Sequence, residues 1–231
     1  MRLSEVCVAI FGIAALLYAL SVAAQEEPIT TPTAKTQQPE GKQTEKAALG
    51  NILFNDPSLS NPPGQSCATC HRPDMAFSDG KVVSEGADKS LGVRNTPSLM
   101  YAKFSTAFVY EEWRKTWVGG QFWDGRADTL AEQALGPLLN PIEMGNSRQT
   151  LAANLRKLSY QNLFVDIYGK DVFANDETLL NAAADALQAF QMTDTFAPFT
   201  SKFDYAQKGL VELTEQEKWG HKLYDTKASC I

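Results

Sequence analysis

Two cysteines and a histidine stand close together in the segment S-C-A-T-C-H at residues 66–71. This C-x-x-C-H spacing is typical of covalent haem c attachment. Two thiols on one short turn can form thioethers with the two vinyl groups of a porphyrin. The next side chain, His71, then presents an imidazole nitrogen to the iron as its proximal ligand. The motif therefore predicts one haem c, attached through Cys67 and Cys70.

Three other interpretations of this motif have less support. A thioredoxin-like C-x-x-C requires a βαβ context, which the sequence does not show. A zinc site needs two further ligands, but the only histidines are His71 and His221 and there is no second C-x-x-C. A disulfide between Cys67 and Cys70 stays open, although so short a loop would strain it.

The N-terminus has the pattern of an export signal. Arg2 precedes a nearly continuous apolar run over residues 6–24, which ends in the small residues V-A-A. This arrangement predicts a signal peptide at 1–24 and a periplasmic protein, with an uncleaved membrane anchor as the alternative. Residues 25–46 are polar and rich in Thr, Gln and Pro, which predicts a flexible linker.

The composition excludes one class of partner. The chain has 231 residues, 44% of them hydrophobic, and a formal net charge of −6. This suits one globular domain with part of another. No basic run is interleaved with aromatic residues, so we expect no nucleic-acid partner.

The segments that must hold the motif are predicted to be mainly helical. Apolar spacing and capping residues predict helices over residues 45–54, 128–139, 149–158, 176–192 and 214–223. The predicted caps are Asp128, Ser147, Asn175 or Asp176, and Thr214. Strand signals are weak and short. The fold class is therefore mainly α, a haem domain with long loops.

A faint internal repeat connects the haem motif with the end of the chain. Residues 50–56 (G-N-I-L-F-N-D) precede one Ser-Cys pair, and residues 220–225 (G-H-K-L-Y-D) precede another. The first pair continues into the haem motif, whereas the second includes Cys230 and is followed only by Ile231. Cys230 is therefore predicted to be the first cysteine of an incomplete second haem motif, unless the repeat is a chance match.

A series of motifs resembles the bacterial di-haem cytochrome c peroxidase family, which includes the MauG proteins. The motifs are L-G-N-I-L-F-N-D-P-S-L-S, S-C-A-T-C-H, R-N-T-P-S-L, F-W-D-G-R-A, E-Q-A-L-G-P and I-E-M-G. The resemblance implies a cytochrome-c-like peroxidatic domain at 47–205 and the beginning of a second, truncated one at 206–231. It implies one haem c in this chain, two in a full-length protein, and a calcium ion between the domains.

The resemblance also implies an activity. Family members reduce hydrogen peroxide to water with electrons from a small cytochrome c or a cupredoxin. MauG-like members instead use an oxidised di-haem to modify a partner protein. A plain electron-carrying cytochrome c is a further alternative, with Met144 or Met192 as the sixth iron ligand. A homodimer is a family expectation.

The matching motifs assign roles to individual residues. Glu143 and Gln133 fall in the distal pocket, where a carboxylate moves a proton between the peroxide oxygens and an amide binds the peroxide. Trp123 falls where the family has an indole between the two haems, as an electron relay. Arg126 is assigned to a haem propionate, and Asn95 to calcium coordination.

Residue type alone leaves simpler interpretations open. The two distal candidates would be solvated residues, and the tryptophan would pack in the core. Arg126 would pair with Asp124 or Asp128, and Asn95 would be a turn residue before Thr-Pro.

Two features depart from the family pattern. No histidine lies between His71 and His221, so we predict a haem whose distal position is open to peroxide without reductive activation. Residues 107–120 are longer than the family's link into F-W-D-G-R, and we interpret them as a loop that faces a partner or a second copy.

Overall fold

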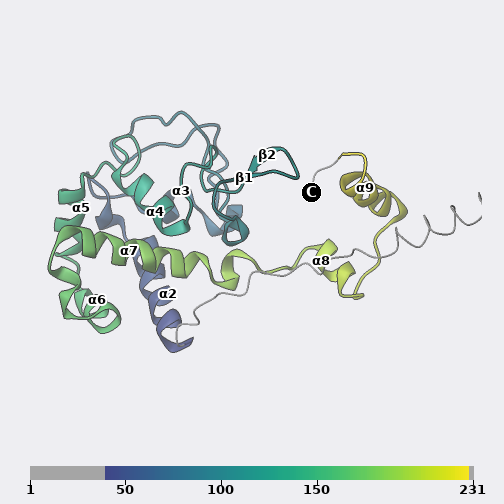
Figure 1. Ribbon diagram of the computed structural model, residues 1–231. Coiled ribbons are helices and arrows are strands. Elements are labelled where there is room, and N and C mark those ends of the chain that lie inside the picture. Colours follow the sequence, from purple (N-terminus) through teal and green to yellow (C-terminus); the bar gives the residue numbers. More distant parts are fainter. Residues whose placement is uncertain (1–39, 229–231) are drawn as a thin grey trace, which may run out of the picture. The chain divides into compact units, whose positions relative to one another are not determined.

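The computed structural model describes residues 40–228 (Figure 1). The predicted signal peptide, the first part of the predicted linker and Cys230 lie outside this range. The α-helices are α2 (Glu40–Asn55), α3 (Cys67–Cys70), α4 (Leu130–Leu139), α5 (Arg148–Leu155), α6 (Gln161–Tyr168), α7 (Asp176–Gln191), α8 (Lys202–Gln207) and α9 (Glu215–Asp225). Two short strands, β1 (Val109–Glu111) and β2 (Thr116–Val118), pair antiparallel. The predicted mainly α fold class is confirmed.

Helix α7 is the element against which α2, α4 and α5 pack. Its buried face combines leucines with alanines. The leucines fill the core beside Phe164 and Phe196, both fully buried, and the alanines let neighbouring helices approach closely. This packing places the C-terminal part of α7 beside the loops that follow α3, so the core is continuous with the haem motif.

Gly50 marks the closest approach between α2 and α7. A methyl group at this position would overlap the backbone carbonyl oxygen of Ala186 and come within 2.8 Å of the Phe190 Cβ. The overlap is with backbone, so it cannot be relieved by rotating a side chain. Only glycine therefore fits this helix crossing.

Replacing Gly50 by alanine is expected to lower the free energy of unfolding by about 1–3 kcal/mol, the cost typical of overpacking. Urea unfolding of the haem-loaded protein measures the change. Gly41→Ala is the matched control in the same helix, because no other described part of the chain comes within 4 Å of its Cβ position. That control should be neutral or stabilising by up to about 1 kcal/mol. Equal losses from both variants would contradict the close approach.

Several helix starts agree with the predicted caps. The side chains of Ser147, Asn175 and Thr214 accept backbone N–H groups at the starts of α5, α7 and α9. Helix α5 ends at Leu155, earlier than predicted, and α2 begins at Glu40, inside the segment predicted as linker.

Helix α4 begins at Leu130, and its cap lies one residue later than the sequence predicts. Its cap is Thr129, whose hydroxyl accepts the Glu132 N–H while the Glu132 carboxylate reaches back to the Thr129 N–H. This reciprocal capping box satisfies two donors at once. Asp128, the predicted cap, instead accepts the backbone N–H of Phe108 at 3.1 Å and fixes the base of the β1–β2 hairpin.

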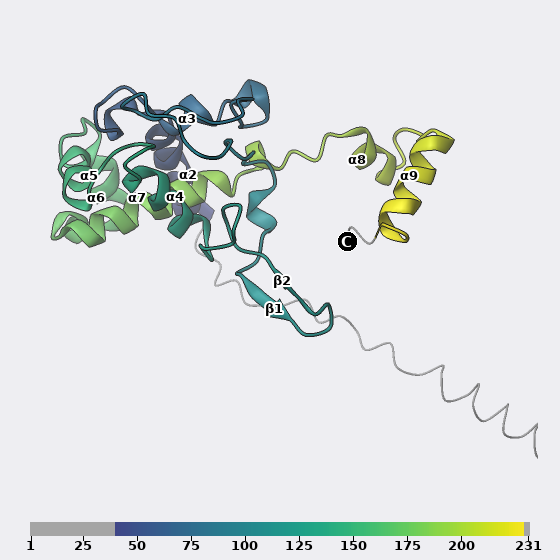
Figure 2. The ribbon, with the colours of Figure 1, turned by 90° about the horizontal axis from the view of Figure 1, so that it is seen from above.

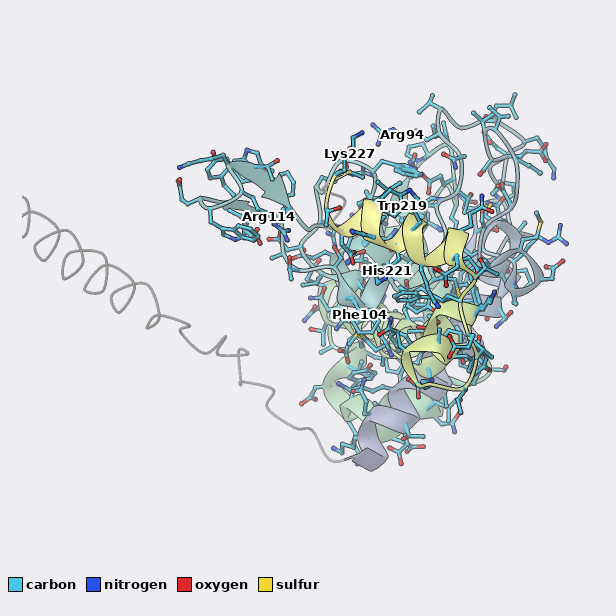
Figure 3. The ribbon with its side chains drawn as sticks, turned by 90° about the vertical axis from the view of Figure 1, so that its right-hand side faces the viewer. Arg94, Phe104, Arg114, Trp219, His221 and Lys227 are labelled. Atoms are coloured by element: carbon cyan, nitrogen blue, oxygen red, sulfur yellow. The ribbon has the colours of Figure 1, made fainter. Side chains whose placement is uncertain are left out.

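Helix α9 is amphipathic in sequence but exposed at every position. Trp219, Leu223 and Tyr224 are its exposed large apolar residues; Figure 3 labels Trp219 and His221 on it. His221 pairs with Asp225 at 3.1 Å. Among the helices within residues 40–228, none is long and apolar enough to cross a bilayer.

Candidate haem site

The haem motif occupies a single helical turn. In α3, Ser66 and Thr69 form a capping box at the start, and the His71 N–H donates to the Cys67 carbonyl at 2.8 Å at the end. The turn places both thiols and the imidazole next to one another along one short element. Both cysteines are free, so the structure does not form the disulfide considered above.

Burial makes both thiols of the motif weaker acids. Burial raises the pKa of Cys67 to about 12 and also raises the pKa of Cys70. Both thiols therefore lose their protons less readily than a free cysteine does. Among residues 40–228 no three His, Cys, Asp or Glu side chains are grouped to hold a metal ion.

The His71 imidazole is fixed by a backbone carbonyl. Its Nδ1 lies 2.9 Å from the Phe77 oxygen, so Nδ1 carries the proton and Nε2 keeps the lone pair that binds iron. Burial lowers the pKa of His71, which favours the neutral, ligating form.

The carbonyl that holds His71 sits in an unusual turn. Ala76 and Phe77 both have positive φ, 52° and 56°, a conformation that costs energy for residues other than glycine. The buried Phe77 ring packs against the Phe196 ring, with ring centroids 4.3 Å apart and an interplanar angle of 39°. This anchoring in the aromatic core keeps the turn, and hence the hydrogen-bond acceptor, in place.

A cavity of about 380 Å³ opens beside α3. Its wall contains every sequence-predicted site residue that the structure describes: Cys67, Cys70, His71, Asn95, Trp123, Arg126, Gln133 and Glu143. They come from α3, from α4 and from three loops. The structure therefore brings together residues that are spread over about a third of the chain, and only Cys230 lies outside the described range.

Glu143 is half-buried in the cavity wall. Asn140 Nδ2 donates to its Oε1 at 2.7 Å. Burial raises the pKa of Glu143, and the hydrogen bond from Asn140 and the charge of Arg126 oppose this rise. A half-buried carboxyl group at a cavity wall can accept a proton and return it. The solvated interpretation of Glu143 is therefore wrong.

Two guanidinium groups share one carboxylate at the cavity wall. Arg126 Nη1 contacts the two Asp124 oxygens at 2.7 and 2.9 Å, and Arg94 Nη1 lies 3.4 Å from Asp124 Oδ2. Of the two partners considered for Arg126, the structure has Asp124. The hydrogen bond from Arg126 lowers the pKa of Asp124, so the group keeps one net positive charge.

Trp123 is not a core residue. Its side chain is 60% exposed, and its Nε1 donates to the Asn95 carbonyl at 3.4 Å. The core-packing interpretation is therefore wrong, because the residue lines the cavity and is largely exposed. Asn95 is itself exposed, and its assignment to calcium stays a prediction.

Three residues of the site were missed from the sequence. Arg94 stands in the quoted R-N-T-P motif, and Asn140 stands three residues before Glu143, so both had a signal nearby. Gln191 had none. It is 5% exposed, lines the cavity, and its Oε1 has no hydrogen-bond partner.

The residues present fit a haem. A buried polar atom without a partner, such as Gln191 Oε1, marks a place where a bound group or water completes the hydrogen bonding. The wall is otherwise largely apolar, with Phe54, Leu99, Met144 and Leu187, which suits a porphyrin face. The two guanidinium groups are matched to carboxylates such as haem propionates.

The chain is similar in sequence to known di-haem proteins. The family model for "Di-haem cytochrome c peroxidase" (CCP_MauG) matches residues 44–212. The methylamine utilization protein MauG of Paracoccus denitrificans is 46% identical over 189 residues, 78% of this chain and 49% of that protein. The cytochrome c peroxidase Ccp of Escherichia coli is 36% identical over 191 residues, 80% of this chain and 37% of that protein.

A solved structure shows the same fold. The di-haem peroxidase BthA of Burkholderia thailandensis superimposes with a TM-score of 0.73 at 35% identity, over 85% of this chain and 49% of that chain. The chain spans about half of the length of the MauG relative and less than half of the length of the Ccp relative. It belongs to the di-haem cytochrome c peroxidase and MauG family.

Proposed function

We propose that this chain carries the peroxide-reacting haem c centre of a periplasmic peroxidase. The observation that supports this most is the gathering of the attachment motif, the proximal imidazole and a half-buried carboxyl group around one cavity. An electron-carrying cytochrome needs the first two but has no use for the third. Family membership supports the same reaction class.

Each residue then has a role in the reduction of hydrogen peroxide, with two electrons and two protons, to two water molecules. Cys67, Cys70 and His71 hold the haem, which supplies the redox change and the binding position for peroxide. Glu143 takes a proton from the inner peroxide oxygen and returns it to the outer one. Gln133 hydrogen-bonds the peroxide, and Asn140 keeps the Glu143 carboxylate in position.

The remaining assignments complete the proposal. Arg94 and Arg126 pair with haem propionates, Trp123 relays electrons, and Asn95 contributes to a calcium site. A small cytochrome c or a cupredoxin supplies the electrons, and Cys230 begins the attachment motif of a second haem. MauG-like protein modification is the second candidate, which the high identity to that relative favours.

Peroxide turnover by the haem-loaded protein is the deciding measurement. We expect hydrogen peroxide to be consumed with oxidation of two equivalents of reduced cytochrome c, and cyanide to bind the ferric iron rapidly because the distal position is open. Met144 is buried in the cavity wall, whereas Met192 is not part of that wall. A spectrum of His–Met ligation, unreactive to cyanide, would overturn the peroxidase proposal in favour of an electron carrier.

A further inference from the structure

The β1–β2 hairpin carries a ladder of aromatic side chains on one face. Tyr110 and Trp117 are cross-strand partners with ring centroids 5.5 Å apart. Phe108, two residues before Tyr110 and hence on the same face, is stacked on Trp117 at 5.1 Å with an interplanar angle of 18°. In Figures 1 and 2 the ribbon extends away from the helices, and all three side chains are exposed.

The base of this ladder contacts the cavity wall. Gly125 has φ +70°, and a Cβ at that position would come within 2.6 Å of the Phe108 ring. The ring thus lies directly against the Gly125 backbone. Gly125 follows Trp123 and Asp124, which both line the cavity. The Phe108 N–H is held by Asp128, so the contact is fixed at two points.

The hairpin also contains a tryptophan in a different setting. Trp113 is 76% exposed, compared with 59% for Trp117. The Arg114 guanidinium, on the part of the hairpin marked in Figure 3, lies 4.4 Å from the Trp113 ring centroid. A positive charge beside an indole opposes loss of an electron. Among the described residues, the ring contacts of Trp117 are a stacked one with Phe108 and an edge-to-face one with Tyr110. The less exposed tryptophan is therefore the easier one to oxidise.

We propose that Trp117 and Tyr110 form a redox-active pair that delivers oxidising equivalents from the cavity to the surface of the hairpin. The proposal rests on the peroxidase function above. One hydrogen peroxide is reduced to two water molecules. Trp117 and Tyr110 supply the two electrons, and each releases one proton, from the indole nitrogen and from the phenol, leaving a neutral radical on each ring. Trp123, Gly125 and Phe108 provide the contact path from the cavity.

With this redox-active pair, the exposed hairpin can exchange electrons with a partner. A reducing partner that contacts it can return electrons to the radicals, and a partner with oxidisable side chains can be modified by them. The partner class is therefore a protein or small molecule that donates one electron at a time. Without a partner, the radicals persist long enough to be trapped.

Spin trapping tests the proposal. The haem-loaded full chain is treated with one equivalent of hydrogen peroxide and a nitroso spin trap, without an electron donor, and digested with trypsin. Cleavage after Arg114 and Lys115 separates residues 104–114, with Tyr110 and Trp113, from residues 116–126. Fragmentation then assigns each adduct to a residue. We expect adducts on Trp117 and Tyr110, and none above background on Trp113.

Matched variants separate a contact path from diffusing oxidants. Trp117→Phe keeps a ring stacked on Phe108 but removes the indole, and we expect loss of the Tyr110 adduct. Trp113→Phe removes the more exposed indole and should leave both adducts unchanged. If the amount of adduct depended only on how exposed each side chain is, Trp113 and Trp219 would be labelled as strongly as Trp117. That result would overturn the proposal. So would peroxide consumption without any hairpin adduct, a result that leaves the peroxidase function intact; absence of peroxide consumption overturns both.

Discussion

Replacing Glu143 by glutamine is expected to lower peroxide-dependent turnover by about 10²–10⁴-fold, the usual contribution of a positioned acid–base group. Glutamine has the same size and still offers an oxygen to Asn140, which donates to Glu143 at 2.7 Å. It cannot accept and return a proton. The value of kcat/KM for hydrogen peroxide, measured with reduced cytochrome c at equal haem content, reports the change.

The pH dependence distinguishes this proton transfer from a structural effect. Burial raises the pKa of Glu143 above its usual 4.5. The carboxylate is the form that accepts a proton, so wild-type activity should fall as the pH decreases through this raised pKa. The Glu143→Gln variant should lack this acid limb. Glu45→Gln, which removes an exposed charge on α2, is the control. Equal effects of both variants would contradict the role of Glu143.

Phe196→Ala should destabilise the protein by about 3–5 kcal/mol, as expected for truncation of a fully buried aromatic side chain. Phe196 is fully buried, and its ring lies 4.3 Å from Phe77 and 5.0 Å from Phe190. Its removal leaves a cavity directly behind the turn that holds His71. Urea unfolding of the haem-loaded variant measures the loss, with the denaturant slope checked for a change in cooperativity.

Phe104→Ala is the matched control for this truncation. Phe104 lies on the surface beside Tyr101 and Phe199, where substitutions usually change stability by less than about 0.5 kcal/mol. A loss from Phe104→Ala as large as that from Phe196→Ala would show that the aromatic core around Phe77 does not carry the stability assigned to it.

The parts of the site that the sequence predicts are those encoded over a few residues. The haem motif is one helical turn, and the capping residues of α5, α7 and α9 act within three positions of themselves. The α4 start was missed because Asp128 and Thr129 are adjacent capping candidates, and only the contact of Asp128 with the hairpin decides between them. Helix α6 was missed because it begins without a side-chain cap.

The rest of the site depends on packing between distant segments. The Arg94–Asp124 pair spans 30 positions, and no periodicity connects them. Gln191 is a polar residue at a buried position of helix α7. The sequence does not show that this position faces a cavity; the structure does. The group that holds His71 is the backbone carbonyl of Phe77. Every residue has such a carbonyl, so the residue type gives no sign of this role. The family resemblance pointed to the predicted cavity residues because members of one family share a fold, and a shared fold brings the same distant positions together.

The exposure of α9 has a consequence for amide hydrogen exchange. This 11-residue helix is held by its capping box and by internal pairs such as Lys218–Glu215 and His221–Asp225, each contributing only tenths of a kcal/mol. Its contacts with α8 are few and exposed, the Lys202–Glu217 ion pair and the edge-to-face contact of Phe203 with His221. A helix of this length is marginal without tertiary packing. We therefore expect the amide protons of α9 to exchange through local opening of the helix. The amide protons in the buried turns of α7 should exchange only when the whole domain unfolds. Exchange rates along the chain thus divide it into two thermodynamic classes.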